Sequence, residues 1–269
     1  MNIVVCIKQV PDTQKVQVDS ETGVLLRDGI ESKMNPYDLY GLQTAIEIKR
    51  KVGGHVFVIT MGPPSAKEVL KEALAMGVDE VYLLTDRKFA GADVLATSFT
   101  LSQGIKSIGE DIDLVICGKQ TTDGDTAQVG PAIAEHLQMP HVSWVLQLIE
   151  IDNDSITVKQ DLGDFYAKTS MKFPCLITVE KGVFEPSLPS YRLMKQTKDK
   201  EINIITYDDL PIKDEKLYGL SGSPTQVERI FEPSFNHQRE RFEGTSEDVS
   251  AKLYQILLEL KFIDEEKQL

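Results

Sequence analysis

Cysteine is scarce in this chain of 269 residues, and the spacing of the three that occur excludes a cross-linked or metal-clamped fold. Cys6, Cys117 and Cys175 form no C-x-x-C pair and fit no disulfide framework, which favours a reducing compartment. Cys6 and Cys117 end short apolar runs, so we expect both to be small buried core residues. The chain starts directly with an apolar run and lacks the charged region and cleavage site of a signal peptide. The sequence therefore predicts a cytoplasmic protein.

Positive charge and long apolar runs are lacking as well. The chain has 29 Lys and Arg against 42 Asp and Glu, which gives a net charge of −13 and a pI near 4.8. Because nucleic-acid binding needs clustered Lys and Arg, this balance argues against a nucleic-acid partner. No apolar run approaches the roughly 18 residues that a membrane span needs, so we expect no membrane insertion. A hydrophobic content of 41% suffices for one sizeable core with an appendage.

The sequence also lacks the common catalytic, metal-binding and nucleotide-binding motifs. Its four histidines stand at no metal-ligand spacing, and no Ser–His–Asp or Cys–His arrangement is visible. Neither G-x-G-x-x-G nor G-x-x-x-x-G-K-[ST] occurs. We therefore predict no metal site, no catalytic residue of the chain's own and no hydrolytic chemistry. The histidines are interpreted as structural residues: His55, His136, His141 and His237.

The first half of the chain alternates short apolar runs with helical patterns. The runs at residues 2–7, 55–60, 80–84 and 114–117 predict buried strands, and the helices are expected at residues 36–51, 65–76, 94–108 and 131–137. Asn35 is expected to cap the first of these helices, and a capping box from Ser65 to Glu68 is expected to open the second. This alternation predicts an α/β fold with a doubly wound, mostly parallel sheet, Rossmann-like and of the adenine-nucleotide-binding type.

The pattern changes after Pro140. Runs at residues 145–151 and 155–160 flank Asp152-Asn153-Asp154, a hairpin signal, and further strands are expected at residues 166–171 and 175–179. These four strands predict an antiparallel extension of the sheet. A smaller hairpin is expected at residues 16–18 and 25–27.

The last third of the chain has little periodicity before its final helix. Residues 180–200 read as a long loop with exposed apolar side chains beside positive charge, which favours a docking surface. Residues 219–244 read as an extended arm, followed by an amphipathic helix over residues 246–262 whose apolar face must be buried somewhere. We expect two domains, an α/β domain at 1–205 that includes a docking segment at 184–200, and an arm with a helix at 206–269.

One glycine-rich and threonine-rich loop between a strand and a helix dominates the functional interpretation. This glycine loop, residues 117–131, could bind a phosphate through free backbone amides and the positive end of the helix that follows. Asp123 and Asp125 would repel a phosphate unless they cap the helix or bind a ribose hydroxyl, so a capped surface loop stays open as the alternative. In a doubly wound sheet, ligands bind beyond the carboxyl ends of the strands. Residues 6–9, 61–63 and 117–130 meet there, and residues 35–38 could join them.

Motifs along almost the whole chain resemble those of the beta subunits of electron-transfer flavoproteins. They are Cys6-Ile7-Lys8-Gln9-Val10-Pro11-Asp12, Asn35-Pro36-Tyr37-Asp38, Met61-Gly62-Pro63, Ala73-Leu74-Ala75-Met76-Gly77, Gly118-Lys119-Gln120, the run from Asp123 to Gly130, Glu185-Pro186 and Met194-Lys195. The resemblance implies a heterodimer in which an alpha subunit holds a mobile FAD. The crevice of the beta subunit then holds either AMP or a second FAD.

The glycine loop resembles that of the electron-bifurcating branch of this family. Members that bind AMP typically have further Asp and Asn residues where this chain has Gly124, Thr126 and Ala127. The resemblance thus implies FAD in the beta subunit, NADH as hydride donor, and a subunit of an NAD-dependent complex that is not catalytic alone. One electron would go to ferredoxin or flavodoxin, and the other through the alpha-subunit FAD to a flavin-dependent dehydrogenase.

The resemblance also assigns the site. The implied cofactor-binding residues are Cys6, Lys8, Asn35, Pro36, Tyr37, Asp38, Met61, Gly62, Phe89, Ala90, Asp93, Gly118, Thr122, Asp123, Gly124, Asp125, Thr126, Ala127, Gln128 and Val129. The implied docking residues are Leu188, Tyr191, Leu193 and Met194. Because residues 187–193 depart from the common order, a 2-hydroxyacid or lactate-type dehydrogenase and an acyl-CoA or enoyl-CoA type are both open. A conventional AMP-binding beta subunit and a non-redox nucleotide-binding regulatory protein are the alternative functions.

Overall fold

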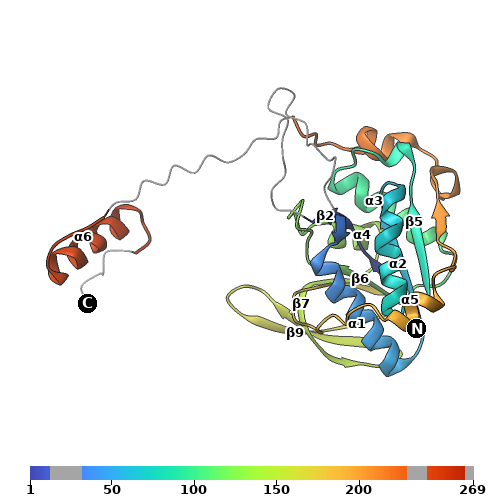
Figure 1. Ribbon diagram of the computed structural model, residues 1–269, viewed down its shortest axis with the longest axis horizontal. Helices are drawn as coiled ribbons and strands as arrows, with labels where there is room; N and C mark the ends of the chain where they lie inside the picture. Colours follow the sequence, from blue (N-terminus) through green and yellow to red (C-terminus); the bar gives the residue numbers. More distant parts are fainter. Residues whose placement is uncertain (13–31, 229–240, 264–269) are drawn as a thin grey trace. The chain divides into compact units, whose positions relative to one another are not determined.

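The computed structural model describes residues 1–12, 32–228 and 241–263, in two compact units, Met1–Ile230 and Phe231–Leu269 (Figure 1). The hairpin expected at residues 16–18 and 25–27, His237 and the middle of the expected arm lie outside the described residues. Within the described residues, no helix is both long enough and apolar enough to cross a membrane.

The first unit is organised around a nine-stranded sheet with the strand order β11-β5-β4-β1-β6-β10-β7-β8-β9. All strands from β11 to β7 are parallel to their neighbours, whereas β7, β8 and β9 pair antiparallel. The strands are β1 (Asn2–Cys6), β4 (His55–Met61), β5 (Glu80–Leu84), β6 (Leu114–Gly118), β7 (His141–Ile151), β8 (Ser155–Asp161), β9 (Tyr166–Lys172), β10 (Cys175–Val179) and β11 (Asn203–Ile205). A separate pair joins β2 (Gln9–Pro11) to β3 (Ser32–Met34).

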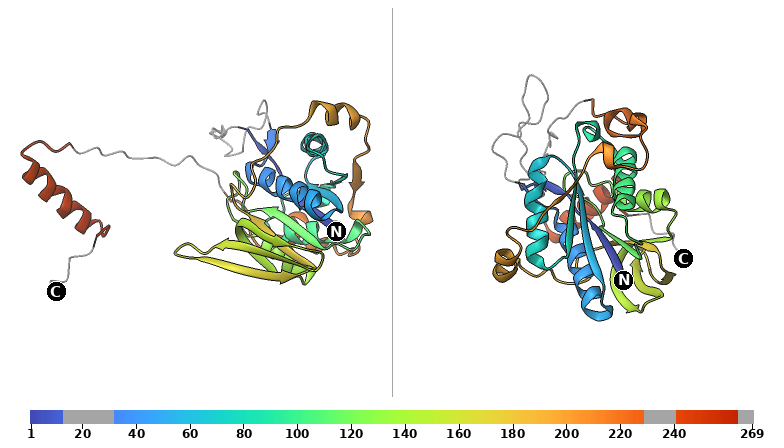
Figure 2. Two further views of the ribbon diagram at one scale, coloured as in Figure 1. Left: turned by 90° about the horizontal axis from the view of Figure 1, so that it is seen from below. Right: turned by 90° about the vertical axis from the view of Figure 1, so that its right-hand side faces the viewer.

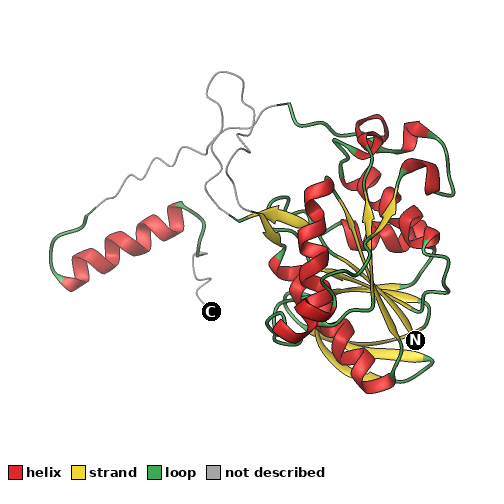
Figure 3. Cartoon of the chain, turned by 45° about the vertical axis from the view of Figure 1, so that its right-hand side comes forward, coloured by secondary structure: helices red, strands yellow, loops and turns green. Residues whose placement is uncertain are grey.

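Two layers of helices cover the sheet, as the doubly wound prediction requires (Figures 2 and 3). Helices α1 (Pro36–Val52) and α2 (Lys67–Met76) pack with Ile3 and Val5 of β1 in one core cluster. Helices α3 (Val94–Ser107) and α4 (Val129–Leu137) pack with Val4 and Cys6 in the other. Successive residues of β1 point to opposite faces, which explains why an almost continuous apolar run is needed here. The predicted α/β class with a mostly parallel sheet is confirmed.

The strand β10, predicted as part of the antiparallel extension, runs in the opposite direction to that prediction. β10 is parallel to both of its neighbours and lies between β6 and β7, so Cys175 pairs with Leu114 in the middle of the sheet. All five residues of β10 are buried, which fits a strand covered on both faces. The prediction of an antiparallel β10 was wrong because it assumed that sequential strands are neighbours, a rule that holds only about two-thirds of the time.

The expected caps of α1 and α2 also differ from the structure. Asn35 stands at the N-cap of α1 but makes no side-chain cap, because its carboxamide binds the glycine loop instead. A 3-10 turn at Pro64–Ala66 precedes α2, and the Ser65 hydroxyl donates to Gln9 Oε1 (3.2 Å) rather than closing a capping box. The C-terminal stop at Gly77 is as expected, with a left-handed φ of 114°.

Two elements in the last third were not predicted. The short helix α5 (Tyr191–Gln196) interrupts the long loop, and β11 pairs with β5 at the edge of the sheet. Residues 206–223 pack against the rest of the first unit. Tyr207, Leu210 and Tyr218 are buried there in the core cluster that also includes residues of α3 and α4. The first compact unit consequently extends to Ile230, whereas the sequence predicted a domain boundary after residue 205.

The second unit contains the predicted amphipathic helix, α6 (Ser246–Glu259). A capping box opens it, in which the Thr245 hydroxyl accepts from the Asp248 amide (3.2 Å) and the Asp248 carboxylate accepts from Thr245. The helix buries none of its residues, and Leu253 is 49% exposed. Within the described residues of the second unit, nothing covers its apolar face.

Candidate functional site

The carboxyl ends of β1 and β6 lie beside the start of α1 at one edge of the sheet, which is where the sequence predicts the ligand crevice. Cys6 and Cys117 are register partners at the ends of these two central strands, and both are buried as predicted. The neighbouring Cys6 thiol and, after it, burial raise the pKa of Cys117, so its side chain is a neutral thiol. The chain leaves β1 toward Lys8 and leaves β6 into the glycine loop, so both segments border the crevice.

Asn35 joins the start of α1 to the glycine loop. Its side-chain nitrogen Nδ2 donates to the backbone carbonyl of Gln120 (2.8 Å), and its side-chain oxygen Oδ1 accepts from the backbone amide of Thr122 (3.2 Å). Because one planar carboxamide makes both bonds, it fixes the loop's distance and its orientation relative to the helix. Asn35 is fully buried, so these bonds have no competition from water.

Lys8 makes a second connection to the same loop, from the end of β1. Its ammonium group lies 2.7 Å from Asp123 Oδ2 and 2.8 Å from Oδ1. The pair is partly exposed, so its contribution to stability is small. The Lys8 amine nevertheless lowers the pKa of Asp123 against the opposing effect of desolvation, so the carboxylate is ionised at neutral pH. This contact answers the objection that Asp123 must repel an anion, since Lys8 neutralises it.

The later part of the glycine loop presents unpaired backbone donors. Within the described residues, the amides of Thr126, Ala127 and Gln128 donate no hydrogen bond, and α4 begins directly afterwards at Val129. Asp125 and Ala127 adopt left-handed conformations with φ of 53° and 54°, which are costly for residues other than glycine. A row of free amides leading into the first turn of a helix is a site that favours an anion.

Asp38, in the first turn of α1, is the most perturbed acid of the crevice. Burial raises its pKa to about 7, while hydrogen bonds from Asn35 and from the amides of Lys8 and Gly118 act in the opposite direction. The Lys8 amide donates to Asp38 Oδ2 over 2.7 Å, and the side chain is only 4% exposed. Asp38 thus lies beneath the crevice rather than on its surface.

A neighbouring cluster around Trp144 was not predicted. The Lys119 ammonium pairs with Glu180 Oε2 (2.6 Å) and lies 4.8 Å from the centre of the Trp144 ring. Trp144 has a φ of 59°, and its amide donates to the Thr178 hydroxyl (3.0 Å). A left-handed tryptophan within a strand has no sequence signature, because tertiary contacts impose it. This tryptophan is the only one in the chain and is therefore a natural optical reporter for the crevice.

Three of the predicted cofactor-binding residues lie in a different environment. Phe89 is buried against the Tyr218 ring, and the Ala90 carbonyl accepts from the Leu220 amide (2.9 Å). Asp93 caps α3 through the Ala96 amide (3.1 Å) and accepts from the Thr225 hydroxyl (2.7 Å). These residues hold the segment that follows residue 217 onto the first unit. The structure does not join them by hydrogen bonds to the glycine loop within the described residues.

The remaining predicted residues lie along the crevice or next to it. Met61 ends β4, which neighbours β1 in the sheet, and the Gly62 amide donates to the Leu84 carbonyl (3.0 Å) at the end of β5. Pro36 and Tyr37 form the first turn of α1. The structure brings together around the glycine loop Cys6, Lys8, Asn35, Pro36, Tyr37 and Asp38 with Gly118, Thr122, Asp123, Gly124, Asp125, Thr126, Ala127, Gln128 and Val129.

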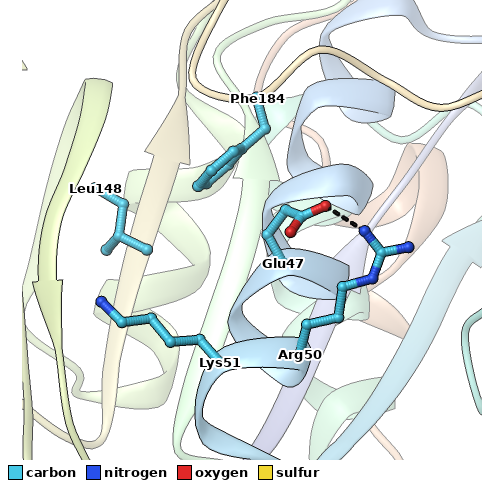
Figure 4. Close-up of a pocket in the computed structure, with 5 residues that line it drawn as sticks. All are labelled: Glu47, Arg50, Lys51, Leu148 and Phe184. Carbon is cyan, nitrogen blue, oxygen red and sulfur yellow. Dashed lines mark hydrogen bonds and ion pairs between the residues drawn. The ribbon is translucent and has the colours of Figure 1, made fainter.

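The predicted docking residues form an exposed apolar strip around α5. Leu188, Tyr191 and Met194 are 89%, 69% and 51% exposed, whereas Leu193 turns inward to the C-terminal end of α2. The Ser190 amide is tied to the Ala75 carbonyl (2.9 Å), so the strip is held on the surface of α2. Close by in sequence, Phe184 lines a shallow pocket with Leu148, Lys51 and the ion pair of Glu47 and Arg50 (Figure 4).

Comparison with known families matches residues 22–210 to the electron transfer flavoprotein domain. The chain belongs to the electron transfer flavoprotein family. It is 46% identical over 258 residues to the electron transfer flavoprotein subunit beta of Thermoanaerobacterium thermosaccharolyticum, covering 96% of this chain and 98% of that protein. It is 44% identical to the subunit beta of Clostridium acetobutylicum, covering 98% and 100% of the two chains. Another relative, 44% identical with 91% and 93% coverage, is the caffeyl-CoA reductase-Etf complex subunit CarD of Acetobacterium woodii.

These matches confirm the family that the sequence motifs indicated. The matched domain covers α1, the glycine loop and the predicted docking segment at 184–200, and ends at residue 210. The two subunit-beta relatives extend the similarity over nearly the whole chain. Electron transport as part of a flavoprotein is thus the general role of the chain.

Proposed function

We propose that this chain is an electron transfer flavoprotein beta subunit that holds FAD in its crevice and belongs to the electron-bifurcating branch. In this proposal the complex takes electrons from NADH and delivers them to ferredoxin or flavodoxin and, through a flavin of an alpha subunit, to a dehydrogenase. The observation that carries it is the row of free amides at residues 126–128 before α4, in a loop held by Asn35 and Lys8. Such a loop suits the phosphates of a dinucleotide.

The residues of the crevice fit this ligand chemically. The free amides and the N-terminus of α4 favour negative charge, and Thr122 and Thr126 provide hydroxyl groups at the exposed surface of the loop. A bound flavin would supply the hydride and single-electron chemistry, while the protein binds, orients and shields it. The chain's own contribution is therefore the shape and charge of the crevice.

Partners are proposed from the two exposed apolar surfaces. The free apolar face of α6 suits an alpha subunit, and the strip of Leu188, Tyr191 and Met194 suits a dehydrogenase. The Acetobacterium relative is named as a subunit of a reductase-Etf complex, which supports an acyl-CoA or enoyl-CoA type of partner as one candidate. A 2-hydroxyacid dehydrogenase is the other candidate.

The nucleotide content of the purified heterodimer tests the proposal. The protein should be co-produced with its alpha subunit, extracted with acid, and its nucleotides separated and quantified. Two FAD per heterodimer is the expected result. One FAD with one AMP would instead indicate a conventional electron carrier in which this chain is scaffold and docking surface. A preparation without flavin would overturn the redox function and leave the regulatory alternative.

A further inference from the structure

The Asp38 carboxyl group lies at the point where three segments of the crevice meet. It lies between Lys8 after β1, whose amide donates to Asp38 Oδ2 (2.7 Å), the closely packed Gly118 at the end of β6, and Asn35 at the start of its own helix. Gly118 approaches so closely that a Cβ there would lie 2.9 Å from the Asp38 amide nitrogen. A carboxyl group in this position controls the spacing of all three segments.

Asn35 extends the influence of Asp38 to the glycine loop. The Asp38 backbone amide donates to the Asn35 backbone carbonyl (3.0 Å), and the Asn35 carboxamide makes the two bonds to Gln120 and Thr122 that hold the loop. The backbone amide of Asn35 in turn donates to the backbone carbonyl of Lys8 (2.9 Å). A disturbance at Asp38 would therefore reach the loop through the Asn35 side chain and through the Gly118 backbone.

We propose that Asp38 is a positioning residue that holds the glycine loop in its binding conformation from below, without touching the nucleotide itself. The inference rests on the proposed function in that it assigns a nucleotide to this loop. It replaces direct contact by Asp38, which the family resemblance implied, because a side chain that is 4% exposed and fully engaged with the protein has little surface to offer a ligand.

The environment of Asp38 favours its neutral form. Burial raises its pKa to about 7, the Lys8 ammonium partly opposes this increase, and the buried Cys117 thiol on β6 is neutral. Tyr37 precedes Asp38 on the same helix. An open loop would hydrate Asp38 and return its pKa toward 3.8, so the closed loop binds the proton more tightly. Raising the pH from 6 to 8 should hence favour opening by roughly tenfold.

Two substitutions distinguish the effect of a neutral side chain at position 38 from the effect of removing the side chain. Asp38→Asn has the shape of the protonated carboxyl, with one acceptor and one donor group, and should keep the loop closed at every pH. Asp38→Ala removes both groups and should open it. Asp113→Asn is the matched control, because Asp113 Oδ2 also accepts a backbone amide, that of Asn2 (2.7 Å), at the opposite end of the strands.

Hydrogen exchange of the nucleotide-free protein, measured by mass spectrometry and corrected for intrinsic rates, tests this without any cofactor. In the wild type, protection of residues 118–125, where the amides of Lys119, Thr122 and Asp125 donate hydrogen bonds, should fall about tenfold between pH 6 and pH 8. Asp38→Asn should be pH-independent and as protected as the wild type at pH 6, and Asp38→Ala at least tenfold less protected at both pH values. Asp113→Asn should follow the wild type. Wild-type protection of the loop in Asp38→Ala would overturn the proposal.

A second experiment measures nucleotide affinity, with ADP as the ligand and the fluorescence of Trp144 as the signal. At pH 6 the Kd of Asp38→Ala should rise at least tenfold, while that of Asp38→Asn should stay within about threefold of the wild type. Equal losses in both variants would contradict a positioning role and indicate direct contact. If the wild type binds neither ADP nor FAD, the proposed function fails, whereas the exchange experiment still decides whether Asp38 holds the loop.

Discussion

At the scale of single residues, the glycines of the crevice differ in what they demand. A Cβ on Gly118 would lie 2.8 Å from the carbonyl carbon of Tyr37, and one on Gly130 would lie 2.5 Å from Thr178 Cγ2, so both positions require glycine for close packing. Gly124 is different, because a Cβ there would meet only the Thr121 hydroxyl at 3.3 Å. A side chain at Gly124 can therefore be added from the solvent side, where the ligand is proposed to bind.

Gly124→Glu should consequently abolish nucleotide retention without unfolding the protein. The added carboxylate places negative charge in the loop that is proposed to bind phosphate near the N-terminus of α4. Gly124→Gln is the matched control, with the same bulk and no charge, and should lose much less affinity. The measurement is nucleotide content after purification, beside a thermal melt. Full occupancy in Gly124→Glu would show that the phosphates bind elsewhere.

Asp38 gives a second residue-scale prediction, on stability against pH. Its folded pKa of about 7 lies above its ordinary 3.8, so the folded state binds the extra proton and stability falls as pH rises from about 4 to 7. The cost at pH 8 is on the order of 4 kcal/mol. Asp38→Asn removes this charge and should raise the Tm of the nucleotide-free protein by several degrees at pH 8 and little at pH 4.5. An equal shift at both pH values would contradict the buried ionisation.

At the scale of elements, the docking strip combines a firm support with exposed apolar groups. α5 begins at Tyr191 with the Ser190 hydroxyl accepting from the Leu193 amide (3.4 Å), and Leu193 packs toward Gly77. Leu188 and Tyr191 are left with most of their surface in solvent. Interface anchors are commonly large apolar or aromatic side chains on rigid supports, with losses of about 2 kcal/mol or more on truncation.

Replacing Leu188 and Tyr191 together by alanine should therefore cut electron delivery to the partner dehydrogenase by more than tenfold. Reduction of the crevice flavin by NADH should be unchanged, because the crevice is built from other segments. Stopped-flow flavin reduction and turnover with the dehydrogenase measure the two steps separately. Leu95→Ala serves as control, since Leu95 is 48% exposed on α3, on the other face of the sheet. Equal losses in both steps would mean that α5 supports the flavin site, and unchanged turnover would move docking elsewhere.

Element boundaries were predictable where periodicity was strong, and topology was not. The strands β1, β4, β5 and β6 and the helices α1 to α4 lie within about two residues of their expected positions, because each must present an apolar face to a core. β7 begins four residues before its expected start, at His141 instead of residue 145. β10 is an apolar run whose direction depends on where the chain re-enters the sheet, which its own residues do not encode. Likewise, α5 and β11 are too short for a periodic signal.

The candidate site shows the same division. Its segments were predictable, because carboxyl ends of parallel strands meet at one edge. The individual contacts were not, since Lys8 and Asp123 are 115 positions apart and Asn35 and Gln120 are 85 apart. Asn35 was expected to cap α1 by local rules, but bonding the glycine loop satisfies its carboxamide better. Phe89 and Asp93 serve the segment after residue 217 for a similar reason, because their partners lie far along the chain.

At the scale of the whole molecule, the two units differ in how far they bury their apolar side chains. The first unit has two extensive cores on the two faces of one sheet. The second unit presents a capped helix, α6, in which even Ile256 and Leu257 are only partly buried and Leu253 is half exposed. An amphipathic helix gains most of its stability from packing its apolar face. We propose that the alpha subunit covers this apolar face of α6.

Leu253→Asp together with Ile256→Asp should weaken association with the alpha subunit. Each buried leucine-sized side chain contributes roughly 1.5–3 kcal/mol, so the two losses together should raise the Kd by at least a hundredfold. Ala251→Asp with Gln255→Asp adds the same two charges to the opposite side of α6 and should leave association unchanged. Analytical ultracentrifugation of the pair over a dilution series measures the Kd directly. If the first double variant dimerises as tightly as the wild type, α6 does not bind the alpha subunit, and its apolar face must pack within its own chain.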